Sequence, residues 1–176
     1  MEDVEISMLP AAPDATIVTR LTEIVNQAYL EGEKGLWRDN AGRTTAKEMA
    51  GLAAQGQLAV ARRADTIIGT VRVRQLAPGL GQLGMLAADP RQRGGGVGRE
   101  LVRFAEDHAR AAGATTMQLE LLVPLAGEHP VKEFLRTWYT RIGYARVGTA
   151  SLADDHPELA PRLAVPCELL VFHKPL

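Results

Sequence analysis

Four glycines within five residues mark the segment of this chain best suited to bind a phosphate. The run Arg93-Gly94-Gly95-Gly96-Val97-Gly98-Arg99 follows an apolar stretch that predicts a strand and precedes one that predicts an amphipathic helix. The first turn of a helix presents unpaired N–H groups and about half a positive charge, so glycines there let backbone donors surround a pyrophosphate. A bound anion would also explain both arginines, whereas an ordinary tight turn with solvated arginines is the alternative.

The same segment argues against several classes of nucleotide enzyme. It lacks the Gly-Lys-Ser/Thr ending of a P-loop, and no Gly-x-Gly-x-x-Gly lies in an early βαβ unit, so kinase, ATPase and dehydrogenase activities are disfavoured.

The single cysteine, Cys167, excludes an internal disulfide and a cysteine metal cage. We expect no metal.

One carboxylate is placed where it would serve as a base. Glu120 lies in the middle of a predicted strand between leucines, where loss of hydration would raise its pKa into a useful range. An ion pair or an exposed position fits the sequence equally well. His108, in the helix after the glycines, is expected to face the core.

The stretch from residue 31 to 43 has the composition of a loop that lines a site. Its acidic residues would attract a cationic amine, Arg38 and Arg43 would hold a carboxylate, and Trp37 would form a wall. The acidic residues are Glu31, Glu33 and Asp39. A solvated loop of mixed charge is the alternative.

Composition limits the remaining possibilities. The chain has 176 residues, 46% of them hydrophobic and 23% charged, which predicts a single domain over residues 1–176. A formal net charge of -1 with scattered basic residues argues against nucleic acid as a partner. An acidic N-terminus and the lack of a run of about 20 apolar residues predict a cytoplasmic protein without a membrane span.

Hydrophobic periodicity supplies the elements that would position these residues. Strands are predicted at 5–8, 58–61, 66–76, 83–88, 117–123, 144–150 and 168–174. Helices are predicted at 14–31, 45–55, 97–112 and 131–142, the second of them opened by a Thr45/Glu48 capping box. Strands first, followed by a strand-helix-strand-helix-strand run, predict a mixed α+β or α/β domain.

Two stretches resemble motifs of one enzyme superfamily. Residues 86–99, Leu-Ala-Ala-Asp-Pro-Arg-Gln-Arg-Gly-Gly-Gly-Val-Gly-Arg, closely resemble motif A of the GNAT superfamily of N-acetyltransferases, whose Gln/Arg-x-x-Gly-x-Gly/Ala signature is matched by Arg93, Gly96 and Gly98. Downstream, Trp138-Tyr-Thr-Arg-Ile-Gly-Tyr144 resembles the aromatic-Tyr-x-x-x-Gly-Phe/Tyr helix end of that family. The order of elements fits from about residue 5 to 174, which is nearly the whole chain.

The resemblance implies an α/β fold with a central, mostly antiparallel, twisted sheet of six to seven strands and helices on both faces. It also implies an acetyl-CoA-dependent N-acetyltransferase that acts on a primary amine of a small molecule or peptide by direct attack on the thioester, with a homodimer possible by analogy. The backbone of Leu86, Ala87 and Ala88 would pair with the pantetheine arm. Arg93 and residues 94–99 would hold the pyrophosphate; these are Gly94, Gly95, Gly96, Val97, Gly98 and Arg99.

Tyr139 occupies the position that commonly protonates the departing sulfur in the family, although packing beside Trp138 would also explain it. One departure is Lys132, which stands where the family often has Asn. A non-catalytic acyl-CoA-binding regulatory module is the main alternative, and a structural protein with an unremarkable glycine turn is a weaker one. Neither the acceptor nor the acyl-chain preference can be derived from the sequence.

Overall fold

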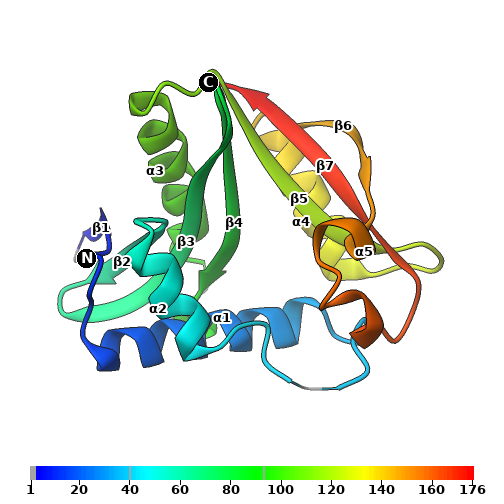
Figure 1. Cartoon of the computed structure of the whole chain (residues 1–176), viewed down its shortest axis with the longest axis horizontal. Helices are drawn as coiled ribbons and strands as arrows, with labels where there is room; N and C mark the ends of the chain where they lie inside the picture. Colours follow the sequence, from blue (N-terminus) through cyan, green and yellow to red (C-terminus); the bar gives the residue numbers. More distant parts are fainter. Residues whose placement is uncertain (1–2, 40, 93) are drawn as a thin grey trace.

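A mixed sheet runs through the centre of the protein (Figure 1). The computed structural model describes residues 3–39, 41–92 and 94–176, and within them the strands form one sheet in the order β1-β2-β3-β4-β5-β7-β6. The strands are β1 Val4–Met8, β2 Leu58–Arg63, β3 Thr66–Ala77, β4 Leu80–Ala88, β5 Thr116–Pro124, β6 Ala145–Ala150 and β7 Cys167–Pro175. Neighbouring strands are antiparallel except for β4 and β5, so the expected mostly antiparallel sheet is confirmed.

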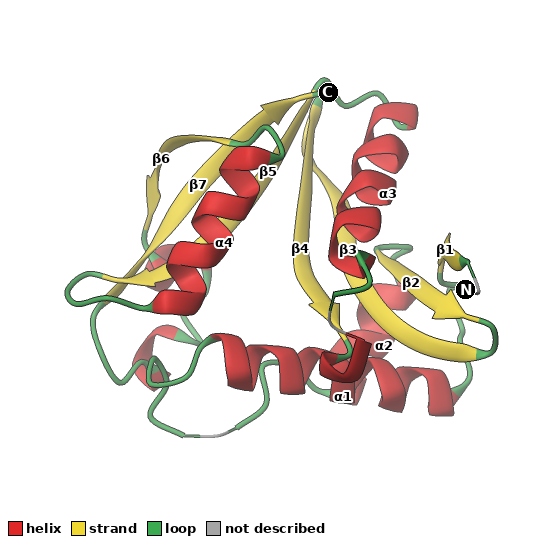
Figure 2. Ribbon diagram, turned by 180° about the vertical axis from the view of Figure 1, so that it is seen from behind, coloured by secondary structure: helices red, strands yellow, loops and turns green. Residues whose placement is uncertain are grey.

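Helices cover both faces of this sheet, as expected. They are α1 Ala15–Gly32, α2 Ala46–Ala54, α3 Val97–Ala111, α4 Pro130–Arg141 and α5 Leu152–Asp155, with 3₁₀ turns at Pro90–Gln92 and Ala160–Arg162. Figure 2 shows α3 and α4 in front of the sheet, whereas α2 and α5 lie on the face turned to the viewer in Figure 1. In the part of the chain that is described, no helix has the length and apolarity needed to cross a membrane.

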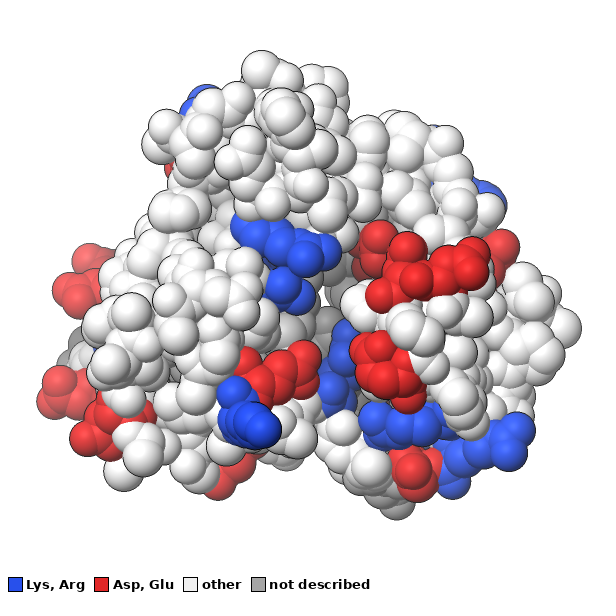
Figure 3. Space-filling model, viewed as in Figure 1, with Lys and Arg blue, Asp and Glu red and all other residues white. Residues whose placement is uncertain are grey.

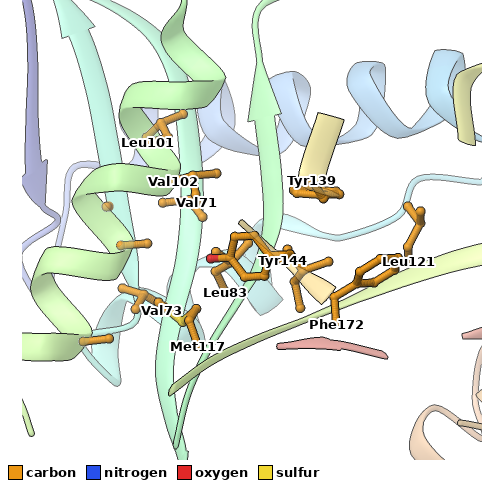
Figure 4. Close-up of a cluster of buried hydrophobic side chains, with 14 of the residues drawn as sticks. Val71, Val73, Leu83, Leu101, Val102, Met117, Leu121, Tyr139, Tyr144 and Phe172 are labelled. Carbon is orange, nitrogen blue, oxygen red and sulfur yellow. The ribbon is translucent and has the colours of Figure 1, made fainter. Parts of the chain in front are cut away.

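The largest apolar core lies between the sheet and the pair α3 and α4. Aliphatic side chains of the strands there surround Tyr139 and Tyr144 (Figure 4). Gly69 of β3 lets α3 approach closely, because a Cβ atom at this position would lie 2.9 Å from the Ala87 carbonyl oxygen and 3.0 Å from a Leu101 methyl carbon. This contact holds the N-terminal half of α3 against the strands.

The two central strands separate along their length. β4 and β5 pair only where Leu80–Gln82 meets residues 116–118, so no strand covers the β5-facing edge of β4 from residue 83 to 88 within the described chain. Met85 interrupts β4 with a positive φ of 47°, and the register against β3 shifts there. The bulge places Leu83 and Leu86 with the core beside α3, and Met85 with the core beside α1.

Local signals in the sequence correctly predicted the starts of two helices, α1 and α2. Asp14 accepts a hydrogen bond from the Thr16 backbone N–H at the start of α1. Thr45 accepts one from the Glu48 backbone N–H at the start of α2. The Glu48 carboxylate, however, accepts a bond from the Thr44 hydroxyl instead of completing the capping box. Because Thr44 is buried, its hydroxyl competes for that carboxylate.

Two expectations about the elements were wrong, and one helix was not predicted. β4 begins three residues earlier than predicted, at Leu80, because its first residues pair with β3 and β5. The segment after β6 contains α5, which polar composition did not suggest. His108 is exposed and stacks on Phe104, while Glu106 takes the buried position and accepts a hydrogen bond from the Tyr144 hydroxyl. Because the buried face of α3 includes the Glu106 carboxylate, the apolar pattern alone assigned the wrong residue to that face.

Candidate active site

A cavity of about 560 Å³ occupies the space between the separating strands β4 and β5. The face shown in Figure 3 is hollowed near its centre, with basic side chains at the upper left of the hollow, acidic ones at its upper right, and both kinds around its lower part. Its walls come from both faces of the sheet, since Tyr139 of α4 and Arg72 of β3 both line it. The candidate catalytic residues Tyr139 and Glu120 and the candidate cofactor-binding residue Leu86 line this one space.

Tyr139 enters the cavity from α4. Its side chain is buried, and its ring lies 5.0 Å from that of Trp138 and 6.1 Å from that of Tyr144 (Figure 4). Burial raises the pKa of Tyr139, and the neighbouring Tyr29 raises it further. No hydrogen-bond partner for its hydroxyl lies among the residues that the structure describes. The phenol therefore stays protonated and is free to donate.

Tyr29 approaches from α1 and was missed by the sequence analysis. Burial raises its pKa, while Arg43 and a hydrogen bond with the Met85 backbone act in the opposite direction. The Arg43 guanidinium lies 5.5 Å from the centre of the Tyr29 ring. Tyr29 and Tyr139 thus both reach the cavity beside the bulge of β4. Because they are far apart in the sequence, their proximity could not be predicted from it.

Glu120 lies on the polar wall of the cavity, on β5. Burial raises its pKa, the Asp155 carboxylate raises it further, and His156 and Arg74 lower it. Glu120 shares this face with Gln118, whose side-chain oxygen lies 2.8 Å from His173 Nε2. A half-buried carboxylate with an elevated pKa has the properties expected of a proton acceptor.

A buried ion pair closes the cavity on the side of α4. Lys132 Nζ lies 2.7 Å from Glu33 Oε2, with side chains 6% and 4% exposed, and Trp37 Nε1 donates to Glu33 Oε1 at 3.3 Å. Glu33 was expected to attract a cationic amine. Its carboxylate is instead neutralised by Lys132 within the protein. Lys132 at this position joins α4 to the loop after α1.

The glycine segment forms the turn that was predicted. Gly94 and Gly96 have φ of 83° and 74°, and a Cβ atom on either would meet nothing within 4 Å. Gly96 caps α3 without any side-chain hydrogen bond, so backbone N–H groups of the first turn are open. Val97 buries its side chain in the core, while Arg99 is exposed. Arg93 lies outside the described residues.

Two groups of polar interactions, one around Asp89 and one at Gln92, hold the residues that lead into this turn. Asp89, at the end of β4, is 3% exposed and accepts hydrogen bonds from Arg91 and Arg20. Hydrogen bonding from Arg91 lowers the pKa of Asp89 to about 2. On the other side, Arg63 of β2 donates to the Gln92 side chain. The turn is thus tied to α1 and to two strands.

The loop from residue 31 to 43 contributes in part. Glu33, Trp37 and Arg43 line the cavity, whereas Arg38 binds the Leu163 carbonyl through Nε at 2.8 Å and lies elsewhere. Asp39 lines a neighbouring cavity of about 480 Å³. Arg72 and Arg74 also line the cavity but were not among the candidates, although valine and arginine alternate over residues 71–74, a pattern that puts both arginines on one face of β3.

The sequence of this chain is similar to those of known acetyltransferases. The sequence profile of the acetyltransferase (GNAT) family matches residues 19–131. An IAA acetyltransferase from Azospirillum brasilense is 39% identical over 62 residues, and this match spans 35% of the chain and 40% of the relative's length.

Solved structures share the fold at low sequence identity. An IAA acetyltransferase from Bacillus cereus is 14% identical with a TM-score of 0.66, covering 99% of this chain and 100% of that one. An aminoglycoside 6′-N-acetyltransferase complexed with coenzyme A is 16% identical with a TM-score of 0.72, covering 97% and 96%. Because the family profile spans most of the chain and the solved structures match its fold almost end to end, this chain belongs to the acetyltransferase (GNAT) family.

Proposed function

We propose that this protein transfers an acetyl or similar acyl group from acetyl-CoA to a primary amine. The observation that carries the proposal is the cavity between β4 and β5, where a protonated phenol, Tyr139, and a carboxylate, Glu120, line one space. These two groups would supply the acid and the base that thioester aminolysis needs.

The chain also offers groups that fit coenzyme A. Backbone donors at Gly94–Arg99 would hold the pyrophosphate, because the uncapped start of α3 and the left-handed glycines leave that space open. The β5-facing edge of β4 from Leu86 to Ala88 would pair with the pantetheine arm as an added strand does. When bound, acetyl-CoA would supply an acyl group activated as a thioester.

Proton transfer is the part of the reaction that the side chains perform. An alkylammonium with a pKa of about 10.4 must lose a proton at a cost of about 4 to 5 kcal/mol at pH 7. Glu120 would accept that proton directly or through water. The neutral amine forms the new C–N bond, the C–S bond breaks, and Tyr139 would donate its phenolic proton to the departing sulfur. The proton that the nitrogen must still lose to become an amide would return to the Tyr139 oxygen, directly or through water.

The remaining partners also belong to this proposal. We infer a small-molecule or peptide amine and no nucleic acid, which is consistent with a cavity of about 560 Å³ and a net charge of -1. The relatives are named for different acceptors, so the acceptor is not taken from them. A homodimer and a cytoplasmic location stay predictions.

Thermal unfolding with added ligands tests the proposal first. Acetyl-CoA and free CoA at about 100 times their Kd should each add roughly 2.7 kcal/mol of stability, whereas NAD and ATP should add none. Release of thiol from acetyl-CoA should then depend on an added amine. Stabilisation without amine-dependent release from any amine would favour the non-catalytic binding module, and no stabilisation would refute both.

A further inference from the structure

Three arginines line one side of the cavity. Arg72 and Arg74 project from the same face of β3, and Arg43 reaches it from the loop before α2. All three are partly buried, so their charges lie in a space of reduced solvent screening. Figure 3 shows basic side chains gathered beside the central hollow.

These arginines lack acidic partners of their own. Among the described residues, no carboxylate oxygen lies within ion-pair distance of Arg43, Arg72 or Arg74. Neutral side chains orient two of them: Arg72 Nε donates to Gln57 at 2.8 Å, and Arg74 Nε donates to Gln82 at 2.7 Å. Each guanidinium keeps its terminal N–H groups for another acceptor.

The pKa of Arg72 is lowered, as expected for a cationic site that has no bound anion. Burial lowers its pKa, and repulsion from Arg74 lowers it further; Glu48 attracts it but accepts a hydrogen bond from Thr44 at 2.7 Å. Clustered guanidinium groups without anions are unfavourable in a partly buried space, and a bound anion would relieve the repulsion.

Acidic groups line the other side of the same cavity. Asp155, at the end of α5, joins Glu120 there and raises the pKa of its carboxyl, whereas His156 and Arg74 lower that pKa. The cavity is therefore positive toward β3 and negative toward β5 and α5. A molecule with one group of each sign would be oriented by this field.

We propose that the acceptor amine carries a carboxylate, which binds at Arg72 and Arg74 while its amino group faces Glu120; this inference rests on the acetyl transfer proposed above. The arginines then determine acceptor specificity and exchange no proton with the substrate, although Arg74 also lowers the pKa of Glu120. Guanidinium groups match the planar carboxylate, which is why we infer an amino acid or a related amine.

The test compares amines that differ only in this charge. α-, β- and γ-Amino acids are assayed with acetyl-CoA against their carboxamides, with 2-aminoethyl phosphate as a second anion. We expect kcat/KM for at least one acid to exceed that of its amide by about 10-fold or more. Intrinsic reactivity favours the amide, whose ammonium loses its proton more readily, so a preference for the acid reports binding.

Variants then assign the preference to the arginines. Arg72→Gln and Arg74→Gln should each raise KM for the acid about 10- to 100-fold. KM for the amide and KM for acetyl-CoA should each stay within about twofold of the wild-type value. Arg74→Lys should retain part of the preference. Arg146→Gln, on exposed β6 outside the cavity, should leave the acid-to-amide ratio unchanged. Turnover of the amide shows that each variant is folded.

The outcomes separate the two proposals. Acetylation of amides and simple alkylamines with no preference for acids overturns this inference and leaves acetyl transfer intact. A preference that survives both glutamine variants also overturns it, as does selective use of 2-aminoethyl phosphate. Absence of both CoA binding and transfer to every amine defeats the proposed function itself.

Discussion

The surroundings of Tyr139 decide its chemical state. Burial between Trp138 and Tyr144 raises its pKa, so the phenol carries its proton at neutral pH. In the proposed reaction, a neutral phenol would contact the neutral thioester without charge repulsion and would donate its proton only when charge develops on sulfur. Its contribution therefore falls on turnover more than on binding.

Tyr139→Phe should lower kcat by about 100-fold or more and leave the Kd for acetyl-CoA nearly unchanged. Tyr144→Phe is the matched control. It loses the hydrogen bond to Glu106 and should cost about 1 kcal/mol of stability, while kcat stays near the wild-type value. Stopped-flow acetylation and calorimetric titration separate these quantities. An unchanged kcat in Tyr139→Phe would reduce Tyr139 to a packing residue.

As the proposed base, Glu120 would link activity to pH, and its raised pKa opposes stability at neutral pH. Its folded pKa is raised, so its favourable contribution to folding is complete below the unfolded value of 4.5 and is lost as pH rises through the folded pKa. Glu120→Gln should therefore raise Tm at pH 7.5 and leave it unchanged near pH 4. The same variant should lower kcat/KM and remove the acidic limb that the wild type shows as Glu120 becomes protonated. A Tm that falls at pH 7.5 would contradict this account.

At the scale of elements, the turn between β4 and α3 depends on backbone shape. Gly96 has a φ of 74° with open space around its α-carbon, so its role is conformational. Alanine in the left-handed region costs about 1 to 2 kcal/mol, or the turn relaxes and its N–H groups move.

Gly96→Ala should lower stability by about 1 kcal/mol and weaken CoA binding. Gly51→Ala gives a contrast, because Gly51 lies inside α2 with nothing within 4 Å of a new Cβ atom. That change should add about 0.5 to 1 kcal/mol and leave CoA binding unchanged. Urea unfolding and CoA titration measure both effects. Wild-type CoA affinity in Gly96→Ala would place the pyrophosphate elsewhere.

The sequence was informative wherever a signal is local. Caps at Asp14 and Thr45 depend on residues two or three positions away, and these elements began where predicted. Gly84 precedes the bulge, but the residue with positive φ is Met85, and the apparent alternation along β4 hid the change of face. Lys132 and Glu33 meet across 99 positions, which no periodicity reveals. The parts of the site that sequence reasoning missed are those formed by tertiary contacts.

At the scale of the whole molecule, two blocks of sheet meet at a short seam. β1 to β4 form one block and β5, β7 and β6 the other, and they pair only along Leu80–Gln82. Beyond the seam, the cavity replaces the missing strand contacts. A ligand that binds there joins the blocks without new protein contacts.

Acetyl-CoA should therefore slow amide hydrogen exchange on both sides of the seam. We expect protection in residues 83–88 of β4, in the first turn of α3 and in α4, with no change in β6 at the outer edge. Mass-spectrometric exchange with and without acetyl-CoA measures this directly. Protection restricted to α3 would argue against the proposed strand-like pairing with β4.

The cavity draws its walls from both faces of the sheet, and this affects the order of events in a catalytic cycle. With α3 and α4 on one face and α1, α2 and α5 on the other, a cofactor and an acceptor would approach from opposite directions. Neither product would then block the exit of the other. Steady-state kinetics should follow a sequential scheme with no steric requirement for a fixed order of departure.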